Sequence, residues 1–395
     1  MMLPTQRMRP VTENAVPVPE WDQAKSRRYG QIRLAWTIGE AGLTLAGLGW
    51  LALSGRSASL RLRLERSLPN ERLTVAGYLA GVGTASWLAH LPFAAARELL
   101  IERAFGLTHQ SFRTWLGDTV KVLALNLTIG VPVGTAAWTV VQRRPRDWWL
   151  VLPSALVPVS LVLGRLAPVL IMPLFNRYEL VTDQEILERV ERLARRTGLT
   201  IAAVYRMDLS RQTDKPNAFF TGLGRAKRIV VSDTLLEQFP PDEIETILAH
   251  EAAHQAHRDL WRMMALEVGI GYLMAFLVSR LAPVMVVRSK RWTGVDRLED
   301  VASVPIVGLA AMLAGLIVTP IGAAVSRRIE RQADRFALDT TCNGSAYASA
   351  LRRIAAISLA DPFPPRLVRI VLASHPPISE RIAMAEAYET TPSNR

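Results

Sequence analysis

The chain has 395 residues, of which 50% are hydrophobic, and its mean hydropathy is +0.17. This composition is too apolar for an ordinary soluble enzyme of this size and indicates a membrane protein. The net charge is +12, from 47 Lys and Arg against 35 Asp and Glu. Because the basic residues flank apolar stretches, we expect anionic lipid headgroups, and no nucleic acid, as their partners. A single cysteine, Cys342, excludes an internal disulfide and a CxxC metal site.

The first half of the chain alternates polar and apolar segments. Residues 1–33 form a polar arm without the apolar run of a signal peptide. Four apolar stretches follow, each near the ~20 residues that cross a bilayer: 34–53, 73–96, 119–141 and 148–175. Polar residues inside them predict a wet interior, although those near span ends can reach the membrane surface instead. These residues are Glu40, His90, Lys121, Asn126 and Arg165.

A polar insert at about 176–260 comes next. Its pattern predicts a helix over 184–196 that ends at Gly198. Two β-like runs, 199–207 and 227–232, flank the segment 217–220. Gly222 and Gly224 do not form a nucleotide-binding loop, because no third Gly or Lys-Ser/Thr follows them.

The insert ends in the sequence HEAAH, which matches the HExxH pattern of zinc proteases. Its histidines, His250 and His254, are four residues apart and lie on one face of a helix, where both imidazoles can hold one metal ion. Glu251 can reach a water molecule on that ion, and zinc lowers the pKa of such a water to ~7. The chemistry indicated is peptide-bond hydrolysis.

The residues before the motif favour a helix. A proline pair followed by two acids is typical of a helix start, and an apolar stripe at helical spacing follows. These residues are Pro240, Pro241, Asp242 and Glu243, then Ile244, Ile247, Leu248 and Ala252. The histidines therefore belong to a helix that packs by its other side. The alternative is a pair of solvated histidines on a polar face.

A third histidine, His257, lies close to the motif, although the chain has only six histidines. The extended metzincin pattern requires Gly at position 257 and His at position 260. The chain has His257 and Leu260 instead, which excludes that subclass. We interpret His257 as a structural residue and not a ligand.

A catalytic zinc site usually has a third protein ligand. Two further apolar stretches, about 261–287 and 301–325, lead to Glu330 and Asp334, which are again four residues apart. Glu330 can complete the metal site, and Asp334 can accept a hydrogen bond from a ligand histidine. The alternative is an ordinary surface helix with i,i+4 ion pairs, because arginines flank both acids.

Topology tests the choice of Glu330. The HEAAH segment precedes the fifth apolar stretch and Glu330 follows the sixth, so two crossings return the chain to the same side of the membrane. An intracellular N-terminus with six spans puts the site in the cytoplasm, on a charge asymmetry between loops that is slight. Segments 54–72 and 143–146 are basic, but so is the arm before the first span.

Several blocks resemble, in order, the type I CAAX prenyl proteases, which are membrane zinc metalloproteases, and their bacterial relatives. The segment ERAFGL at 102–107 is similar to the family's EExFGF, and PLFN at 173–176 to its PLFN turn. NAF at 217–219, RIV at 228–230 and DTLL at 233–236 are similar to its strand blocks. ERQAD at 330–334 matches ExxAD, and His375-Pro376 with Glu380-Arg381-Ile382 matches HPxxxERI. The chain departs from the usual HELGH at Ala252 and Ala253.

The resemblance implies a role for each matching residue. His250, His254 and Glu330 would bind one Zn²⁺ per chain, with Glu251 as general base. Asp334 would orient a ligand histidine, His375 would stabilise the oxyanion, and Arg381 would support His375. The strand of Asn217, Ala218 and Phe219 would bind the substrate backbone by strand addition. Without the family, His375 is only a histidine before two prolines.

The fold that follows is mainly α: a polytopic helical membrane protein of six or seven spans with a small α+β, gluzincin-like zinc-metalloprotease insert. We expect four regions: an arm at 1–33, a four-span membrane region at 34–175, a peptidase region at 176–338, and a C-terminal segment at 339–395 that completes the site and ends in a flexible tail.

The expected activity is endoproteolysis of membrane-associated or lipidated peptides. The abundant arginine and compact insert favour a bacterial protein, placed in the inner membrane with its site facing the cytoplasm. Cleavage of prenylated CAAX C-termini specifically is an alternative. Another is a non-enzymatic transporter or scaffold, which would explain the spans but not the grouping of metal-binding side chains on one side.

Overall fold

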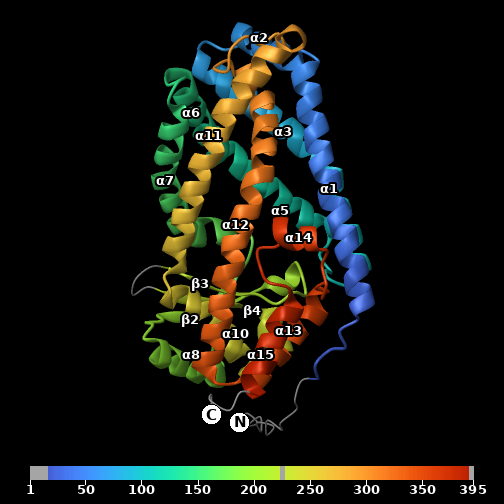
Figure 1. The fold of residues 1–395 in the computed structure, drawn as a ribbon, viewed down its shortest axis with the longest axis vertical. Helices are drawn as coiled ribbons and strands as arrows, with labels where there is room; N and C mark the ends of the chain where they lie inside the picture. Colours follow the sequence, from blue (N-terminus) through green and yellow to red (C-terminus); the bar gives the residue numbers. More distant parts are fainter. Residues whose placement is uncertain (1–16, 223–226, 391–395) are drawn as a thin grey trace, which may run out of the picture.

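The computed structural model describes residues 17–222 and 227–390. Residues 1–16 of the predicted 1–33 arm, Gly224 of the excluded glycine loop and residues 391–395 of the expected tail lie outside these ranges. The molecule is elongated, with long helices running along its upper part and a small sheet with shorter helices at the lower end (Figure 1). Both ends of the described chain lie at that lower end.

Four helical stretches among the described residues are long and apolar enough to cross a membrane. They are Phe112–Arg143, Trp148–Leu174, Asp259–Thr293 and Val301–Thr341. These contain the third to sixth predicted spans. The first and second predicted spans lie in α1 (Gln23–Leu53) and α3 (Glu71–Ala95), long helices of the same upper bundle that fall outside this group (Figure 1).

The membrane helices are interrupted by wider or tighter turns at prolines and polar residues. The helix over 148–174 continues through Pro153 and Pro158, widens into a π-helical turn at Pro168 and tightens into a 3-10 turn at Pro173. The elements of this half are η1 (Ala96–Ile101), α4 (Glu102–Ala104), α5 (Phe112–Leu125), η2 (Asn126–Gly130), α6 (Val131–Arg143), α7 (Trp148–Leu166), η3 (Ala167–Ile171) and η4 (Met172–Leu174).

The segment 54–72, which the sequence suggests is a basic loop, contains the helix α2 (Arg56–Ser67). Gly55 turns the chain with a φ of 69°, which favours glycine. An i,i+4 ion pair at 3.1 Å between Arg61 and Glu65 supports the helix. The Ser57 hydroxyl donates to the carbonyl of Ala302 at 2.6 Å, so α2 closes the upper end of the bundle (Figure 1).

Two of the polar residues inside the predicted spans, Glu40 and His90, have polar partners on neighbouring helical segments. Glu40 on α1 lies 3.2 Å from the Arg97 guanidinium, and the Thr44 hydroxyl lies 3.0 Å from Nε2 of His90 on α3. Such contacts satisfy groups that would be costly in a membrane if they were unpaired.

The lower unit is built on a four-stranded sheet of order β1-β2-β4-β3. The strands are β1 (Tyr178–Leu180), β2 (Ala203–Met207), β3 (Ala218–Thr221) and β4 (Arg228–Ser232). The pair β2–β4 is parallel, and β3–β4 is antiparallel with Phe219 opposite Val230. Strands β2 and β4 match the two predicted runs, whereas β1 was not predicted. Strand β3 forms one edge of the sheet.

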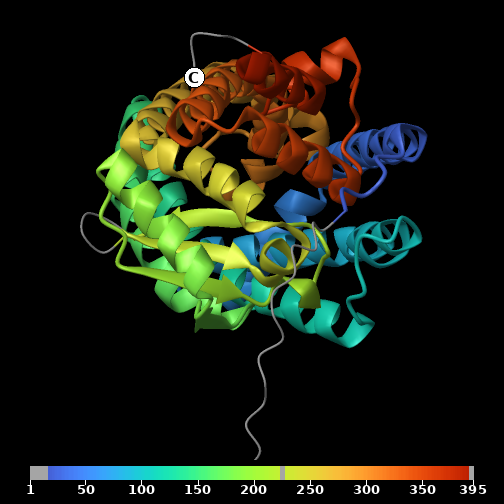
Figure 2. The ribbon, with the colours of Figure 1, turned by 90° about the horizontal axis from the view of Figure 1, so that it is seen from below.

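Helices cover this sheet and form the core of the lower unit. Helix α8 (Gln184–Thr197) ends at Gly198 as predicted, with Asp183 as its N-cap. Seen from below, the sheet and α8 lie on one side and the C-terminal helices on the other (Figure 2). The remaining helices are α9 (Asp233–Gln238), α10 (Pro241–Ala256), α11 (Asp259–Thr293), α12 (Val304–Thr341), α13 (Gly344–Ser358), α14 (Arg366–Val371) and α15 (Ile378–Thr390).

A buried ion pair fastens α10 to α13. Arg353 donates to Glu243 at 2.7 Å, with both side chains almost fully buried, and Ser349 donates to the same carboxylate at 2.6 Å. A buried charge needs such partners. The start of α10 is therefore held against α13, and the metal-binding side chains lie further along the same helix.

Candidate metal centre

Helix α10 presents the HEAAH residues as predicted. It begins at Pro241, with Asp242 and Glu243 in its first turn, where acids favour the helix dipole. Its apolar stripe is buried, as Leu248 and Ala252 illustrate. His250 and His254 lie one turn apart, with ring centroids separated by 5.1 Å.

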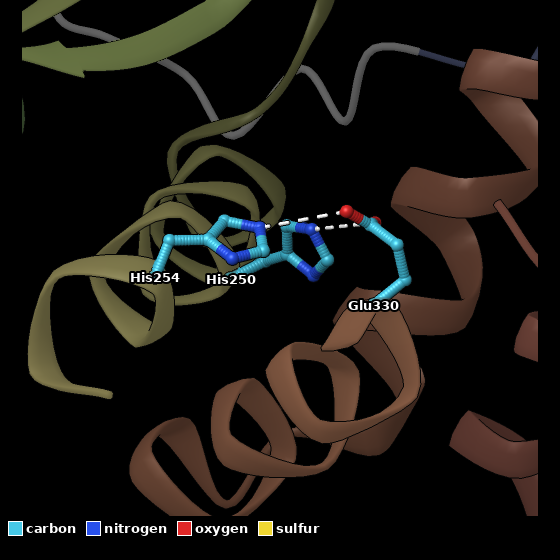
Figure 3. A group of neighbouring side chains, drawn as sticks. All are labelled: His250, His254 and Glu330. Carbon is cyan, nitrogen blue, oxygen red and sulfur yellow. Dashed lines mark ion pairs between the residues drawn. The ribbon is translucent and has the colours of Figure 1, made fainter. Parts of the chain in front are cut away.

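Helix α12 brings the carboxylate of Glu330 to these two imidazoles. The helix is continuous from the sixth predicted span to Thr341, so the span itself positions the acid. Nε2 of His250 lies 3.4 Å from Glu330 Oε2, and Nε2 of His254 lies 3.7 Å from Glu330 Oε1 (Figure 3). One ligand atom from each residue lies within 4.8 Å of the others, close enough to hold one metal ion.

The residues fit a divalent metal. Glu330 is buried, and its Oε2 accepts no hydrogen bond from the described residues, although Nε2 of His250 and Nε2 of His375 lie 3.4 and 3.3 Å away. A buried carboxylate oxygen without a donor is costly unless a cation binds it. Two imidazoles and one carboxylate are also the ligand set of a common class of catalytic zinc sites. The geometry thus favours Glu330 as a metal ligand over the alternative of an ordinary surface ion pair.

Two residues contact the other ring nitrogen of His250, and a third supports them. Nδ1 lies 2.9 Å from Asp334 Oδ1 and 3.2 Å from the Tyr347 hydroxyl, which donates to Asp334 at 2.6 Å. Arg381 donates two hydrogen bonds to the Asp334 carboxylate, at 2.9 and 2.6 Å. Burial opposes a charge on His250, but the carboxylates of Asp334 and Glu330 outweigh it and raise the pKa of His250 to about 9. The two carboxylates therefore favour a positive charge at the position of the His250 imidazole.

A separate acid holds His254. Its Nδ1 lies 3.0 Å from Oδ2 of Asp259, which is buried at the start of α11. Arg262 donates to the other oxygen of Asp259 at 2.8 Å. Both imidazoles are thus oriented through Nδ1 by a carboxylate, which leaves Nε2 facing Glu330.

Glu251 and His375 lie beside the same centre. Burial raises the pKa of Glu251, and the charge of Glu330 acts in the same direction, whereas the two imidazoles oppose this shift. A raised carboxyl pKa suits a group that accepts and returns a proton near neutral pH. Nε2 of His375 lies 3.3 Å from Glu330 Oε2, and its side chain is 58% exposed. The His375 side chain can therefore contact both the metal centre and a molecule that approaches from solvent.

Other predicted residues have different surroundings. Arg381 contacts Asp334 and Tyr347, where we expected it to support His375. The predicted substrate strand corresponds to β3, and Asn217 precedes it and pairs its backbone with Ser232. The ring of His257 packs edge-on against Phe336 at 5.2 Å, and His257 is not part of the metal-binding group.

Sequence reasoning missed Asp259 and Tyr347. Asp259 had a weak signal, as an acid five residues beyond His254 at the start of a helix. Tyr347 had none, because α13 folds back onto α10 through tertiary contacts that no local pattern predicts.

Comparison with known proteins agrees with this geometry. The sequence model described as "Peptidase family M48" matches residues 181–389, more than half of the chain. The chain belongs to this family. A second model, "CAAX prenyl protease N-terminal, five membrane helices", matches residues 18–177. Its description counts five helices in the region where we expected four spans. The chain is thus an integral membrane protein of a metallopeptidase family.

Relatives match to different extents. An uncharacterized metalloprotease of Bacillus subtilis, YhfN, is 28% identical over 87% of this chain and 81% of its own. CAAX prenyl protease 1 of Saccharomyces cerevisiae is 32% identical over 52% of this chain and 45% of its own, so the alignment spans about half of that relative. The crystal structure of S. mikatae Ste24p is similar in fold, with a TM-score of 0.81 and 22% identity over 94% of this chain and 92% of that one.

Proposed function

We propose that the protein is a zinc metalloendopeptidase that cleaves membrane-associated or lipidated peptides. One observation carries this proposal: helices α10 and α12 bring His250, His254 and the carboxylate of Glu330 together, with one ligand atom of each close enough to hold a single metal ion (Figure 3). A non-enzymatic transporter or scaffold gives no reason for that grouping.

The residues divide the proposed reaction among them. A zinc ion in this position would supply Lewis acidity toward the peptide carbonyl and toward a water molecule. Glu251 would take a proton from the water and return it to the leaving amine. His375, which is exposed beside Glu330, would donate to the oxyanion. Strand β3, at the edge of the sheet, would pair with the substrate backbone.

The position of the site along the helices supports a substrate at the membrane. Trp261, in the first turn of α11, is 53% exposed and lies seven residues after His254. On α12, Glu330 lies five residues beyond Val325, the last residue of the sixth predicted span. A peptide held at the bilayer surface by a lipid or an apolar segment would therefore be near the centre. Prenylated C-termini are the narrower alternative, which similarity to CAAX prenyl protease 1 favours.

Mass spectrometry of the products tests the substrate proposal. Purified protein is incubated with matched peptides that carry a farnesyl group, another acyl lipid or no lipid, with and without a chelator. We expect chelator-sensitive cleavage of both lipidated peptides. Cleavage of the farnesylated peptide alone would establish the CAAX alternative, and no metal-dependent cleavage of any peptide would refute the peptidase proposal.

We also propose that the site faces the cytoplasm of a bacterial inner membrane. The basic start of α1 lies at the same end of the molecule as the metal centre, and positive residues favour the cytoplasmic side (Figure 1). The chain's single cysteine, Cys342, is exposed at the C-terminal end of α12, beyond Glu330 and on the same side of the sixth predicted span. A membrane-impermeant maleimide should label Cys342 in inverted vesicles but not in intact spheroplasts. Labelling in intact spheroplasts would reverse the orientation.

A further inference from the structure

A basic cavity of about 730 Å³ lies where α10, α11 and α12 meet, separate from the metal centre. With 3.6 residues per turn, Arg328, Gln332, Arg335 and Asp339 share a face of α12 that points away from Glu330. The lining residues are His257, Arg262, Arg328, Arg331, Gln332, Arg335, Phe336 and Asp339. Four arginines thus face one acid around an open space.

The charges of this cavity are not all neutralised by the protein. Asp259 pairs with Arg262, Glu380 with Arg331, and Asp339 with Arg335, at 2.8, 3.5 and 3.2 Å. Arg328 is exposed and has no acidic partner within 4.0 Å among the described residues. Nδ1 of His257 is buried and also lacks a hydrogen-bond partner among them. The cavity therefore offers donors to an anion with several acceptor oxygens.

The cavity lies at the boundary between the apolar and polar parts of α11 and α12. Arg262 is in the first turn of α11, next to the exposed Trp261. Arg328 follows Val325, the last residue of the sixth predicted span, by three positions. Arg262 donates to Gln332 at 3.2 Å, which joins the two helices at this height. Tryptophan and arginine at such a boundary are typical of the headgroup region, where lipid phosphates lie.

We propose that this cavity binds the phosphate of an anionic phospholipid headgroup. The phosphate oxygens accept from Arg328 and neighbouring arginines, and the acyl chains lie along the apolar parts of α11 and α12 above. Arg262 faces both this cavity and Asp259, which orients His254, so it also belongs to the metal centre. Arg328 is therefore the residue that tests lipid binding without disturbing that centre.

The test measures lipid bound to the purified full chain in a neutral detergent, by native mass spectrometry during titration with phosphatidylglycerol. We expect Arg328→Gln to weaken binding about tenfold, the usual effect of losing one charge-assisted hydrogen bond. The matched control is Arg66→Gln, an exposed arginine on α2 at the opposite end of the bundle, which should bind as the parent does. Phosphatidylcholine, whose choline offsets the phosphate charge, should bind more weakly than phosphatidylglycerol.

Three results would overturn the proposal. They are unchanged binding by Arg328→Gln, equal losses in Arg328→Gln and Arg66→Gln, and displacement of the lipid by an equal concentration of inorganic phosphate, which would assign the cavity to a free anion. The titration requires no hydrolysis and can be repeated in Glu251→Gln protein. Its outcome is therefore independent of whether the chain is a peptidase.

Discussion

Replacing Glu251 with glutamine is expected to abolish peptide hydrolysis while leaving the metal content of the purified protein unchanged. Glu251 is not among the three residues whose ligand atoms converge, and glutamine has nearly the same size. The amide cannot accept the proton from water that the proposed reaction requires. Loss of a general base typically lowers the rate about 10²–10⁴-fold. Turnover of a lipidated peptide and metal analysis of the same preparation measure both quantities.

A matched control separates loss of the base from a general change of charge. Glu237→Gln removes an acid at the surface, 62% exposed and paired with Arg206, and should leave turnover at the parent level. Substantial turnover by Glu251→Gln would remove Glu251 from the mechanism. Loss of metal in the same variant would show instead that Glu251 helps to build the site.

The second large effect is expected for Glu330→Ala, which should lower metal occupancy and with it all activity. Glu330 supplies the only carboxylate of the converging group. Loss of a hydrogen-bond partner of a ligand already weakens metal binding about 10–100-fold, so loss of a ligand should weaken it further. Metal bound after dialysis against a graded series of chelator concentrations measures the change.

Two further variants make that result specific. Glu330→Gln keeps the size of the buried side chain, so a fall in metal content in this variant too cannot come from a cavity in α12. Asp339→Ala removes an exposed acid from the same helix and should retain the metal. Parent-like metal content in Glu330→Ala, in protein that elutes as a single folded species, would exclude Glu330 as the third ligand.

Local sequence patterns predicted the elements that carry the centre. The proline and acids before HEAAH marked the start of α10, and Gly198 marked the end of α8. The i,i+4 spacing of Glu330 and Asp334 placed both acids on one helix face, as a ligand with its supporting acid or as part of a surface ion-pair helix, and Asp334 contacts His250 in the structure. The helix predictions are confirmed because helix periodicity and capping are local properties of the chain.

Long-range contacts were not predictable in the same way. Strand β1 has three residues and forms only by pairing with β2. The partner of Arg381 is Asp334, 47 residues earlier in the chain, and the family resemblance suggested His375 instead. Helix α2 lies in a segment that was expected only as a basic connection between two spans, although Arg61 and Glu65 have helical spacing. Strand β1 and the Arg381–Asp334 pair depend on tertiary packing, which a single sequence does not record.

The central claim is one ion held by side chains from α10 and α12. Anomalous diffraction at the zinc edge, from crystals of the zinc-loaded protein, tests it most directly. The ion should lie about 2.0–2.2 Å from Nε2 of His250, Nε2 of His254 and a carboxylate oxygen of Glu330. An ion bound to His257 or His375 in place of Glu330, or no ion between the two helices, would contradict the account.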